Sequence, residues 1–88
     1  MLAALSASCG PRLYVFRCAD GYVVRAQFTG DGARLRLPDT TLTMPHLRSA
    51  DGARYGVGDL VFWERGNSAF MQRGDSIIHR DCRLDAND

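Results

Sequence analysis

The 88-residue sequence contains no lysine, and all 11 of its basic residues are arginine. The absence of lysine excludes Schiff-base chemistry and phosphate-binding loops that require an ammonium group. What remains is a set of planar, permanently charged guanidinium groups, which suit the binding of carboxylates. The formal net charge is only +1. Such a balanced charge indicates no partner among nucleic acids or anionic membrane surfaces.

Long hydrophobic runs are also absent, and no apolar segment is long enough to cross a bilayer. The first eight residues, M-L-A-A-L-S-A-S, are small, apolar and uncharged, and are shorter than a complete secretory signal. Because they directly precede Cys9, they resemble a bacterial lipobox. We expect residues 1–11 to be a signal or lipobox remnant with Cys9 lipidated; the alternative is an ordinary signal remnant with a free cysteine. Residues 12–84 would form one domain, and residues 85–88 a short tail.

Cysteine is scarce, and none of the three cysteines has the C-x-x-C spacing of the usual zinc pattern. Cys18 ends one apolar segment and Cys82 ends the last, which predicts a disulfide between the first and last strands. Closing a loop of roughly 65 residues would stabilise the chain by about 4 kcal/mol, a large contribution where the core is thin. A disulfide implies an oxidising compartment. The alternative is two buried free thiols.

Motifs for catalysis or metal binding are missing as well. The two histidines, His46 and His79, lie far apart in the sequence, and no pattern brings them together with carboxylates or thiolates. Glu64 is the one glutamate, and we interpret it as a solvated strand end. The sequence therefore predicts no metal, no cofactor and no enzymatic activity.

Alternation of apolar and polar residues is the main pattern that is present. It recurs in short segments from Arg12 onward, separated by turn signals such as Asp20-Gly21 and Gly74-Asp75. Seven or eight short antiparallel strands in a chain of this length predict an all-β fold, a small closed barrel or sandwich. The last strand is expected at residues 76–82. The segment from Pro45 to Gly52 lacks clean alternation and is predicted to be the longest loop.

Two glycine turns carry an arginine and an aromatic residue nearby. One contains Asp51-Gly52, followed by Arg54 and Tyr55, and the other is Gly66-Asn67, preceded by F-W-E-R. These residues could be ordinary turns and core with solvated arginines. The alternative is that the two loops present rigid aromatic and guanidinium groups, which are preferred anchors in protein interfaces.

Four segments of the sequence, taken in order, resemble a known family. They are Tyr14–Cys18, Asp51–Tyr55, the run F-W-E-R-G-N-S-A-F from Phe62, and Cys82. They resemble the bacterial periplasmic and membrane-bound inhibitors of c-type lysozyme, whose pattern runs Y-x-C, S-G-x-x-Y, F-W-x-K-G-x-x-A and a closing C. The resemblance covers about residues 13–82. It implies a small antiparallel barrel closed by a cysteine pair, in agreement with the alternation.

The resemblance also implies a mechanism, in which a loop serine and a loop lysine enter the lysozyme cleft and engage its catalytic carboxylates. By position, the serine corresponds to Asp51 and the lysine to Arg65. The residues that match the pattern directly are Gly52, Tyr55, Phe62, Trp63 and Gly66.

The two departures from the family pattern differ in their consequences. Arginine keeps the positive charge of lysine. Aspartate would place a third carboxylate against two others in a partly desolvated cleft. Asp51 could instead pair within the chain with Arg54 or Arg65, or Ser49 could take the role of the serine. Otherwise the chain inhibits c-type lysozyme weakly, or it binds a different lysozyme or a wall-associated partner.

The resulting hypothesis is a binding protein in the periplasm, or anchored to the outer membrane, whose partner is a c-type lysozyme. It would contact a membrane only through Cys9 and would bind no nucleic acid. The expected lysozyme-binding residues are Ser49, Asp51, Gly52, Arg54, Tyr55, Arg65 and Gly66. Phe62 and Trp63 would support the loops from the core. The alternative is a non-inhibitory envelope lipoprotein or binding module with the same barrel.

Overall fold

The computed structural model describes residues 12–87, and the side chains of residues 12–85. The predicted signal or lipobox remnant at residues 1–11, including Cys9, lies outside the described residues.

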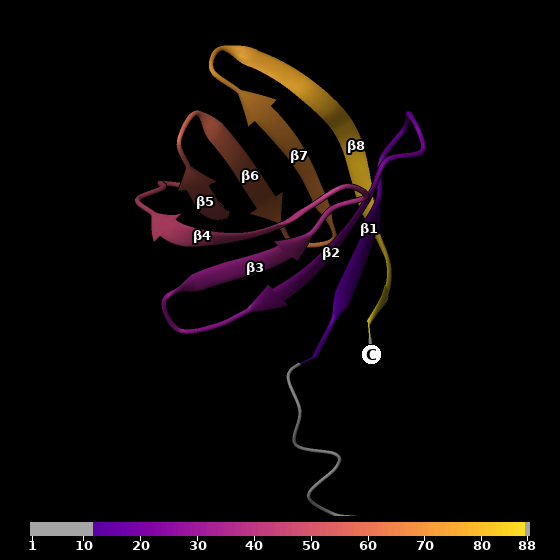
Figure 1. The fold of residues 1–88 in the computed structure, drawn as a ribbon, viewed down its shortest axis with the longest axis horizontal. Coiled ribbons are helices and arrows are strands. Elements are labelled where there is room, and N and C mark those ends of the chain that lie inside the picture. Colours follow the sequence, from indigo (N-terminus) through magenta and orange to yellow (C-terminus); the bar gives the residue numbers. More distant parts are fainter. Residues whose placement is uncertain (1–11, 88) are drawn as a thin grey trace, which may run out of the picture.

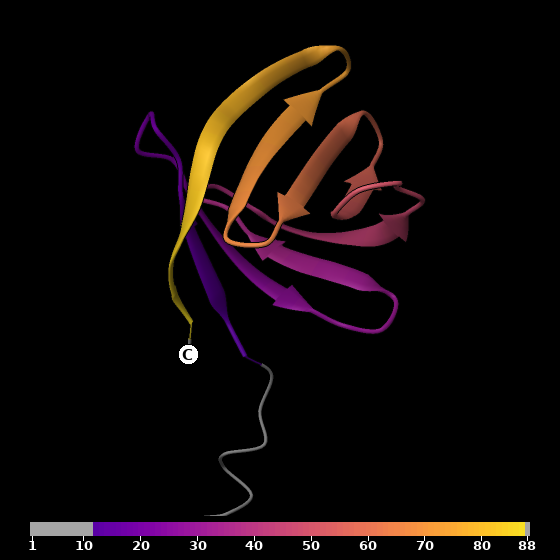
Figure 2. The same cartoon turned by 180° about the vertical axis from the view of Figure 1, so that it is seen from behind.

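Eight antiparallel strands form a closed barrel in which each strand pairs with its neighbours in the sequence and β1 pairs with β8 (Figures 1 and 2). The all-β prediction and the small closed barrel are therefore confirmed. The strands are β1 (Tyr14–Arg17), β2 (Val23–Phe28), β3 (Gly32–Arg36), β4 (Thr41–Leu47), β5 (Ala53–Val57), β6 (Leu60–Arg65), β7 (Ser68–Arg73) and β8 (Ser76–Asn87). The described residues contain no helix long and apolar enough to span a bilayer.

The barrel interior is filled by the apolar residues of the alternating pattern. Because successive side chains of a strand point to opposite faces, every second residue of each strand points inward, and most of these residues are apolar. Phe16 and Phe62 lie edge to face with their ring centroids 5.5 Å apart. The largest fully buried side chains are Phe16, Phe62, Leu35, Met44, Met71, Val24 and Cys82.

The predicted disulfide joins Cys18, directly after β1, to Cys82 of β8, and both cysteines are buried. The alternative of two free thiols is therefore wrong. Beside it, the β1–β2 turn is held against β8, because the rings of Tyr22 and His79 stack 3.6 Å apart. Asp20 also contacts Nδ1 of His79 at 2.7 Å, and this hydrogen bond is the main reason that the pKa of Asp20 is lowered.

Two strand boundaries differ from those predicted. The segment from Pro45 onward is not wholly a loop, because β4 continues to Leu47. Pro45 lies opposite Gly32, and the main-chain N–H of His46 finds its acceptor in the carbonyl of Asp31, so the ladder tolerates the proline. The last strand also continues to Asn87 rather than stopping at Cys82, because residues 83–87 close the barrel against β1.

The up-and-down order of the strands divides the turns between two ends of the barrel. The β2–β3, β4–β5 and β6–β7 connections lie at one end, together with the start of β1 and the end of β8. We call this the site end. The other four connections lie at the opposite end.

Candidate functional site

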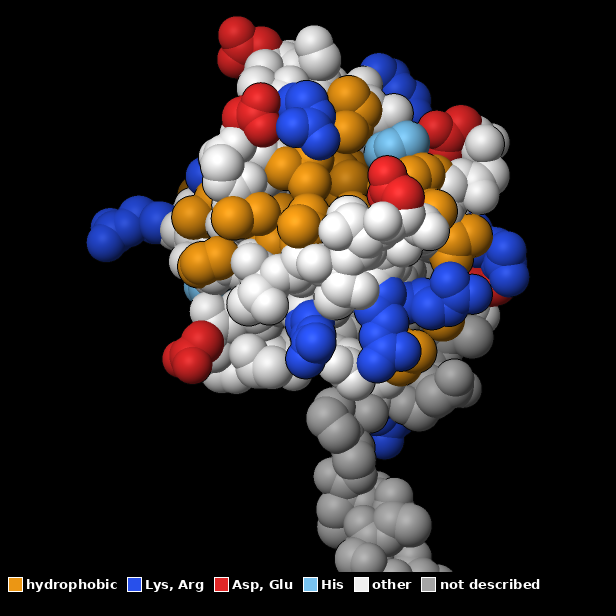
Figure 3. All heavy atoms as spheres, in the orientation of Figure 1, with side chains coloured by type: hydrophobic (Ala, Val, Ile, Leu, Met, Phe, Trp, Pro, Cys, Tyr) orange, Lys and Arg blue, Asp and Glu red, His pale blue; other side chains and the backbone are white. Residues whose placement is uncertain are grey.

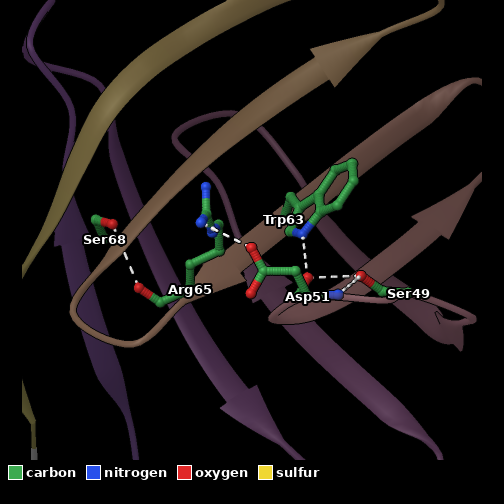
Figure 4. Close-up of polar contacts among 5 residues, drawn as sticks. All are labelled: Ser49, Asp51, Trp63, Arg65 and Ser68. Carbon is green, nitrogen blue, oxygen red and sulfur yellow. Dashed lines mark hydrogen bonds and ion pairs between the residues drawn. The ribbon is translucent and has the colours of Figure 1, made fainter.

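Two loops at the site end lie next to each other because the strands that carry them pair directly. The β4–β5 loop comprises residues 48–52 and the β6–β7 turn comprises residues 66–67. Ala53, which follows the first loop, is paired with Glu64, two residues before the second. The two glycine turns singled out in the sequence are thus brought together (Figure 4).

The β4–β5 loop is held by main-chain atoms of Asp51. The hydroxyl of Ser49 donates to the carbonyl oxygen of Asp51 at 2.6 Å and accepts from its N–H at 3.2 Å. The indole Nε1 of Trp63 donates to the same carbonyl at 2.8 Å (Figure 4). None of these bonds uses the carboxylate, so all three would remain available if the Asp51 side chain were replaced.

Gly52 is required by both backbone conformation and space. Its φ is +71°, in the left-handed region that favours glycine. A Cβ atom at this position would lie 2.6 Å from the carbonyl oxygen of Glu64 and 2.7 Å from Cγ of Arg65. The close approach of the two loops therefore depends on the absence of a side chain.

Arg65 forms an ion pair with Asp51 across the two loops, with Nη2 and Oδ2 2.7 Å apart (Figure 4). Both side chains remain exposed, at 58% and 66% respectively. Of the pairings left open by the sequence, the structure therefore shows Asp51 with Arg65. The guanidinium lies at the rim and beside the other glycine loop, but it already holds a carboxylate of its own chain.

The β6–β7 turn is held by hydrogen bonds from β7 and from β8. Gly66 has a φ of +66°, and the hydroxyl of Ser68 donates to the carbonyl of Arg65 at 3.3 Å. The carbonyl of Asn67 accepts from the N–H of Leu84 in β8 at 2.7 Å. The backbone that carries Arg65 is thus positioned from β7 and β8.

Arg54 lies on the outer face of the barrel rather than in the gap between the loops. Its Cζ is 5.1 Å from the ring centroid of Trp63, and its Nη1 donates to the carbonyl of Arg48 at 3.3 Å. The ring of Phe70 also lies beside Trp63, with centroids 5.5 Å apart. Trp63 is therefore an outward-facing, half-buried residue, which corrects its predicted place in the core; Phe62 lies in the core as predicted.

Tyr55 and Glu64 face the barrel interior. Only 7% of Tyr55 is exposed, and its ring packs against Phe28 and His46. Burial, and to a lesser extent the nearby Glu64 carboxylate, raise the pKa of the Tyr55 hydroxyl. Little of Tyr55 is therefore exposed to a partner, and its expected contact with lysozyme stays a prediction that would use this small exposed part.

Glu64 is half-buried rather than a fully solvated strand end, and burial raises the pKa of its carboxyl. No group of three or more potential metal-ligating side chains lies together in residues 12–87. The described residues therefore form two hydrogen-bonded loops that present an exposed guanidinium.

One contributor to the site was missed in the sequence: the indole N–H of Trp63, which ties the β4–β5 loop to β6. The signal that could have found it is the alternation of β6. Since Leu60 and Phe62 fill the core, Trp63 must lie on the opposite face.

Comparison with known proteins decides the family. Residues 16–79, which contain both loops, match the family model described as membrane-bound lysozyme-inhibitor of c-type lysozyme. The chain belongs to this family.

Two curated relatives carry the same description. The chain is 43% identical to the membrane-bound lysozyme inhibitor of C-type lysozyme from Yersinia enterocolitica over 54 residues, which are 61% of this chain and 46% of the relative. It is also 43% identical to the protein of that name from Escherichia coli over 42 residues, which are 44% of this chain and 38% of the relative. The matched region is thus less than half the length of these relatives. No solved structure gives a significant match.

Proposed function

We propose that this member of the lysozyme-inhibitor family binds a c-type lysozyme and occludes its active-site cleft, without catalysing a reaction itself. The observation that carries the proposal is the exposed guanidinium of Arg65, held at the rim of the barrel beside the rigid Ser49–Gly52 loop. The family and the names of the relatives point to the same partner.

The chemistry of the target explains why a guanidinium would inhibit it. Lysozyme hydrolyses glycosidic bonds with two carboxyl groups, one of which must be protonated to act as a general acid. A permanently charged guanidinium placed between these groups would form charge-assisted hydrogen bonds and favour the ionised form of both. The inserted loops would also exclude the glycan.

Rigidity of the two loops supports the same mechanism. The main chain of both loops is already held in the unbound chain by hydrogen bonds from Ser49, Trp63 and Ser68. Binding therefore needs little further ordering, which favours affinity.

The internal ion pair sets a condition on binding. Arg65 must exchange the carboxylate of Asp51 for the carboxylates of the lysozyme, or share its donors among them. Because the internal pair is exposed, separating it costs only about 0–1 kcal/mol. The larger unfavourable term is electrostatic repulsion, because binding would bring the negative charge of Asp51 close to the two carboxylates of the lysozyme.

We place the protein in the bacterial envelope, in the periplasm or anchored to the outer membrane through Cys9, where it would protect the cell wall. A disulfide between Cys18 and Cys82 fits an oxidising compartment. The two relatives are named membrane-bound.

Titration of the purified chain into a turbidity assay of c-type lysozyme acting on bacterial cell walls tests the proposal. Inhibition at micromolar concentrations, competitive with a soluble chito-oligosaccharide substrate, is the expected result. Absence of inhibition would remove c-type lysozyme as the partner, and non-competitive inhibition would remove occlusion of the cleft as the mechanism.

A further inference from the structure

The outer face of β2 and β3 carries a concentration of positive charge that the net charge of the chain conceals. Strands β2, β3 and β4 contain three arginines and no aspartate or glutamate. The arginines are Arg25, Arg34 and Arg36, and all three are exposed. We call these three residues the arginine face. In Figure 3, arginine side chains gather over the lower part of the molecule, where Figure 1 places β2 and β3.

Two of these arginines lie directly opposite each other. Arg25 and Arg36 are cross-strand partners in the β2–β3 ladder, and Arg34 lies one step along the same face of β3. Side chains that are directly opposite across a ladder have Cβ atoms about 5 Å apart, and like charges in this arrangement are destabilising. The arrangement therefore opposes folding unless an anion neutralises it.

The arginine face has no internal neutralisation, a property that it shares with five other described arginines (Arg12, Arg48, Arg54, Arg80 and Arg83); only its arginines are placed opposite each other with no acidic residue on the same strands. Among the described residues, the arginines that form ion pairs are Arg17, Arg65 and Arg73. Within the same part of the chain, no carboxylate lies within ion-pair distance of the arginine face. Its outward neighbours on β4 are Thr41 and Thr43, which add hydroxyl groups.

A pocket opens at the edge of this face. It has a volume of about 330 Å³, and its lining includes Arg34, Thr43, Pro45 and the main chain around Gly32. Its lining is mostly apolar, although Asp31 also borders it. A cationic row beside an apolar pocket suits an amphiphile with an anionic headgroup better than it suits a single-stranded nucleic acid, for which the face offers no stacking aromatic ring.

We propose that the arginine face docks on a bilayer surface that contains anionic phospholipid headgroups. Phosphate oxygens would accept hydrogen bonds from the guanidinium groups, whose forked donors match their geometry. This contact would be a second one, in addition to the anchor at Cys9, which the sequence predicted as the only membrane contact because the net charge is close to zero; it does not depend on that anchor.

The docked orientation leaves the candidate lysozyme site accessible. In the closed order of eight strands, β2 and β3 lie across the barrel from β6 and β7, as Figures 1 and 2 show. A bilayer against β2 and β3 would therefore leave the outer side of the Arg65 strand facing away from the lipid.

Sedimentation of the full, non-acylated chain with lipid vesicles tests the proposal. The chain is expected to pellet with vesicles of equal parts phosphatidylcholine and phosphatidylglycerol, not with phosphatidylcholine alone, and to be released by high salt. The double variant R25Q/R36Q should bind about 30-fold more weakly, at roughly fivefold for each arginine near the surface. The matched control R80Q/R83Q removes the same charge from exposed arginines on β8 and should change binding by less than about threefold.

Three outcomes would overturn the proposal: no binding of the original chain to the mixed vesicles, equal loss in both double variants, or equally tight binding to duplex DNA at the same salt concentration. Lysozyme inhibition by R25Q/R36Q should be unchanged, so failure of this proposal and failure of the proposed function are separate results.

Relief of the like-charge pair should also raise the melting temperature of R25Q/R36Q above that of R80Q/R83Q. A lower melting temperature would show that the arginines stabilise the barrel and would overturn the argument from unfavourable charge.

Discussion

At the scale of single residues, Asp51 takes part in two independent sets of contacts. Its main-chain atoms hold the β4–β5 loop through Ser49 and Trp63, whereas its carboxylate only pairs with Arg65. The conformation of the loop and the charge that it presents are therefore separable by mutation.

Replacing Asp51 by serine should strengthen lysozyme inhibition by roughly tenfold, because the substitution frees Arg65 and removes a like charge from the cleft. The free energy of unfolding should change by less than about 1 kcal/mol, as expected for an exposed ion pair. Inhibition constants and urea denaturation give the two values. Asp59→Ser, which breaks the Arg73–Asp59 pair at the other end of the barrel, should leave inhibition unchanged. Equal or weaker inhibition by Asp51→Ser would show that the carboxylate is not a handicap.

Gly52 is expected to tolerate no side chain. Gly52→Ala adds a Cβ that meets the Glu64 carbonyl in a left-handed conformation, and it should reduce the free energy of unfolding by about 3 kcal/mol. The matched control is Gly58→Ala, where φ is +61° and nothing lies within 4 Å, so that only the backbone term of about 1 kcal/mol remains. Equal losses in the two variants, measured by urea denaturation, would contradict the close approach of the loops.

Glu64 gives a pH dependence whose sign follows from its burial. Its pKa in the folded chain is raised above the ordinary value, so the folded state holds the proton more tightly than the unfolded state does. The folded chain is therefore more stable when Glu64 is protonated. This contribution to the free energy of unfolding is present at low pH and is lost as the pH rises through the pKa of Glu64 in the folded chain. Glu64→Gln should therefore match the original chain at about pH 4 and be more stable at about pH 7. Thermal melting at both values tests this, and a variant less stable at the higher pH would contradict it.

At the scale of strands and loops, alternation predicted most of the barrel because period two is a direct consequence of strand geometry. It failed where pairing, rather than side-chain pattern, defines the strand. The residues around Pro45 look irregular in sequence, yet they pair because the N–H of His46 reaches Asp31. Similarly, residues 83–87 become a strand only because β1 is available to close the barrel.

The position of the candidate lysozyme site was predictable from the sequence, whereas the contacts of its side chains were only partly predictable. Turn chemistry located both glycine loops, since Gly52 and Gly66 supply positive φ angles. The choice of ion-pair partner for Asp51 and the burial of Tyr55 could not be predicted. They depend on the β5–β6 register, which places Tyr55 opposite the core residue Phe62.

The disulfide links the first and last strands and should be the largest single covalent contribution to stability. Cys18 and Cys82 are 64 positions apart, so removing the cross-link in the C18A/C82A variant should lower the free energy of unfolding by about 4 kcal/mol. Urea denaturation of the variant, and of the original chain with and without reductant, provides the comparison. An unchanged denaturation midpoint would show that the barrel does not depend on the cross-link.

At the level of the complete barrel, the two proposed binding surfaces lie on different parts of the molecule. The site end carries the Asp51 and Arg65 loops, the far end carries the stacked Tyr22 and His79, and the arginine face lies across from β6 and β7. A rigid, closed barrel can therefore present a protein-binding site while another face is occupied.

The role of the Arg65 guanidinium is tested by comparing the lysozyme inhibition constants of Arg65→Ala and Arg73→Ala. The two arginines are similarly exposed, at 58% and 56%, and each pairs with one aspartate, but only Arg65 lies at the site end. Loss of a charge that becomes buried against carboxylates should weaken inhibition by about 100-fold in Arg65→Ala, whereas Arg73→Ala should change it by less than about twofold. Unchanged inhibition by Arg65→Ala, or an equal loss in both folded variants, would contradict the central claim that one guanidinium at the barrel rim blocks the enzyme.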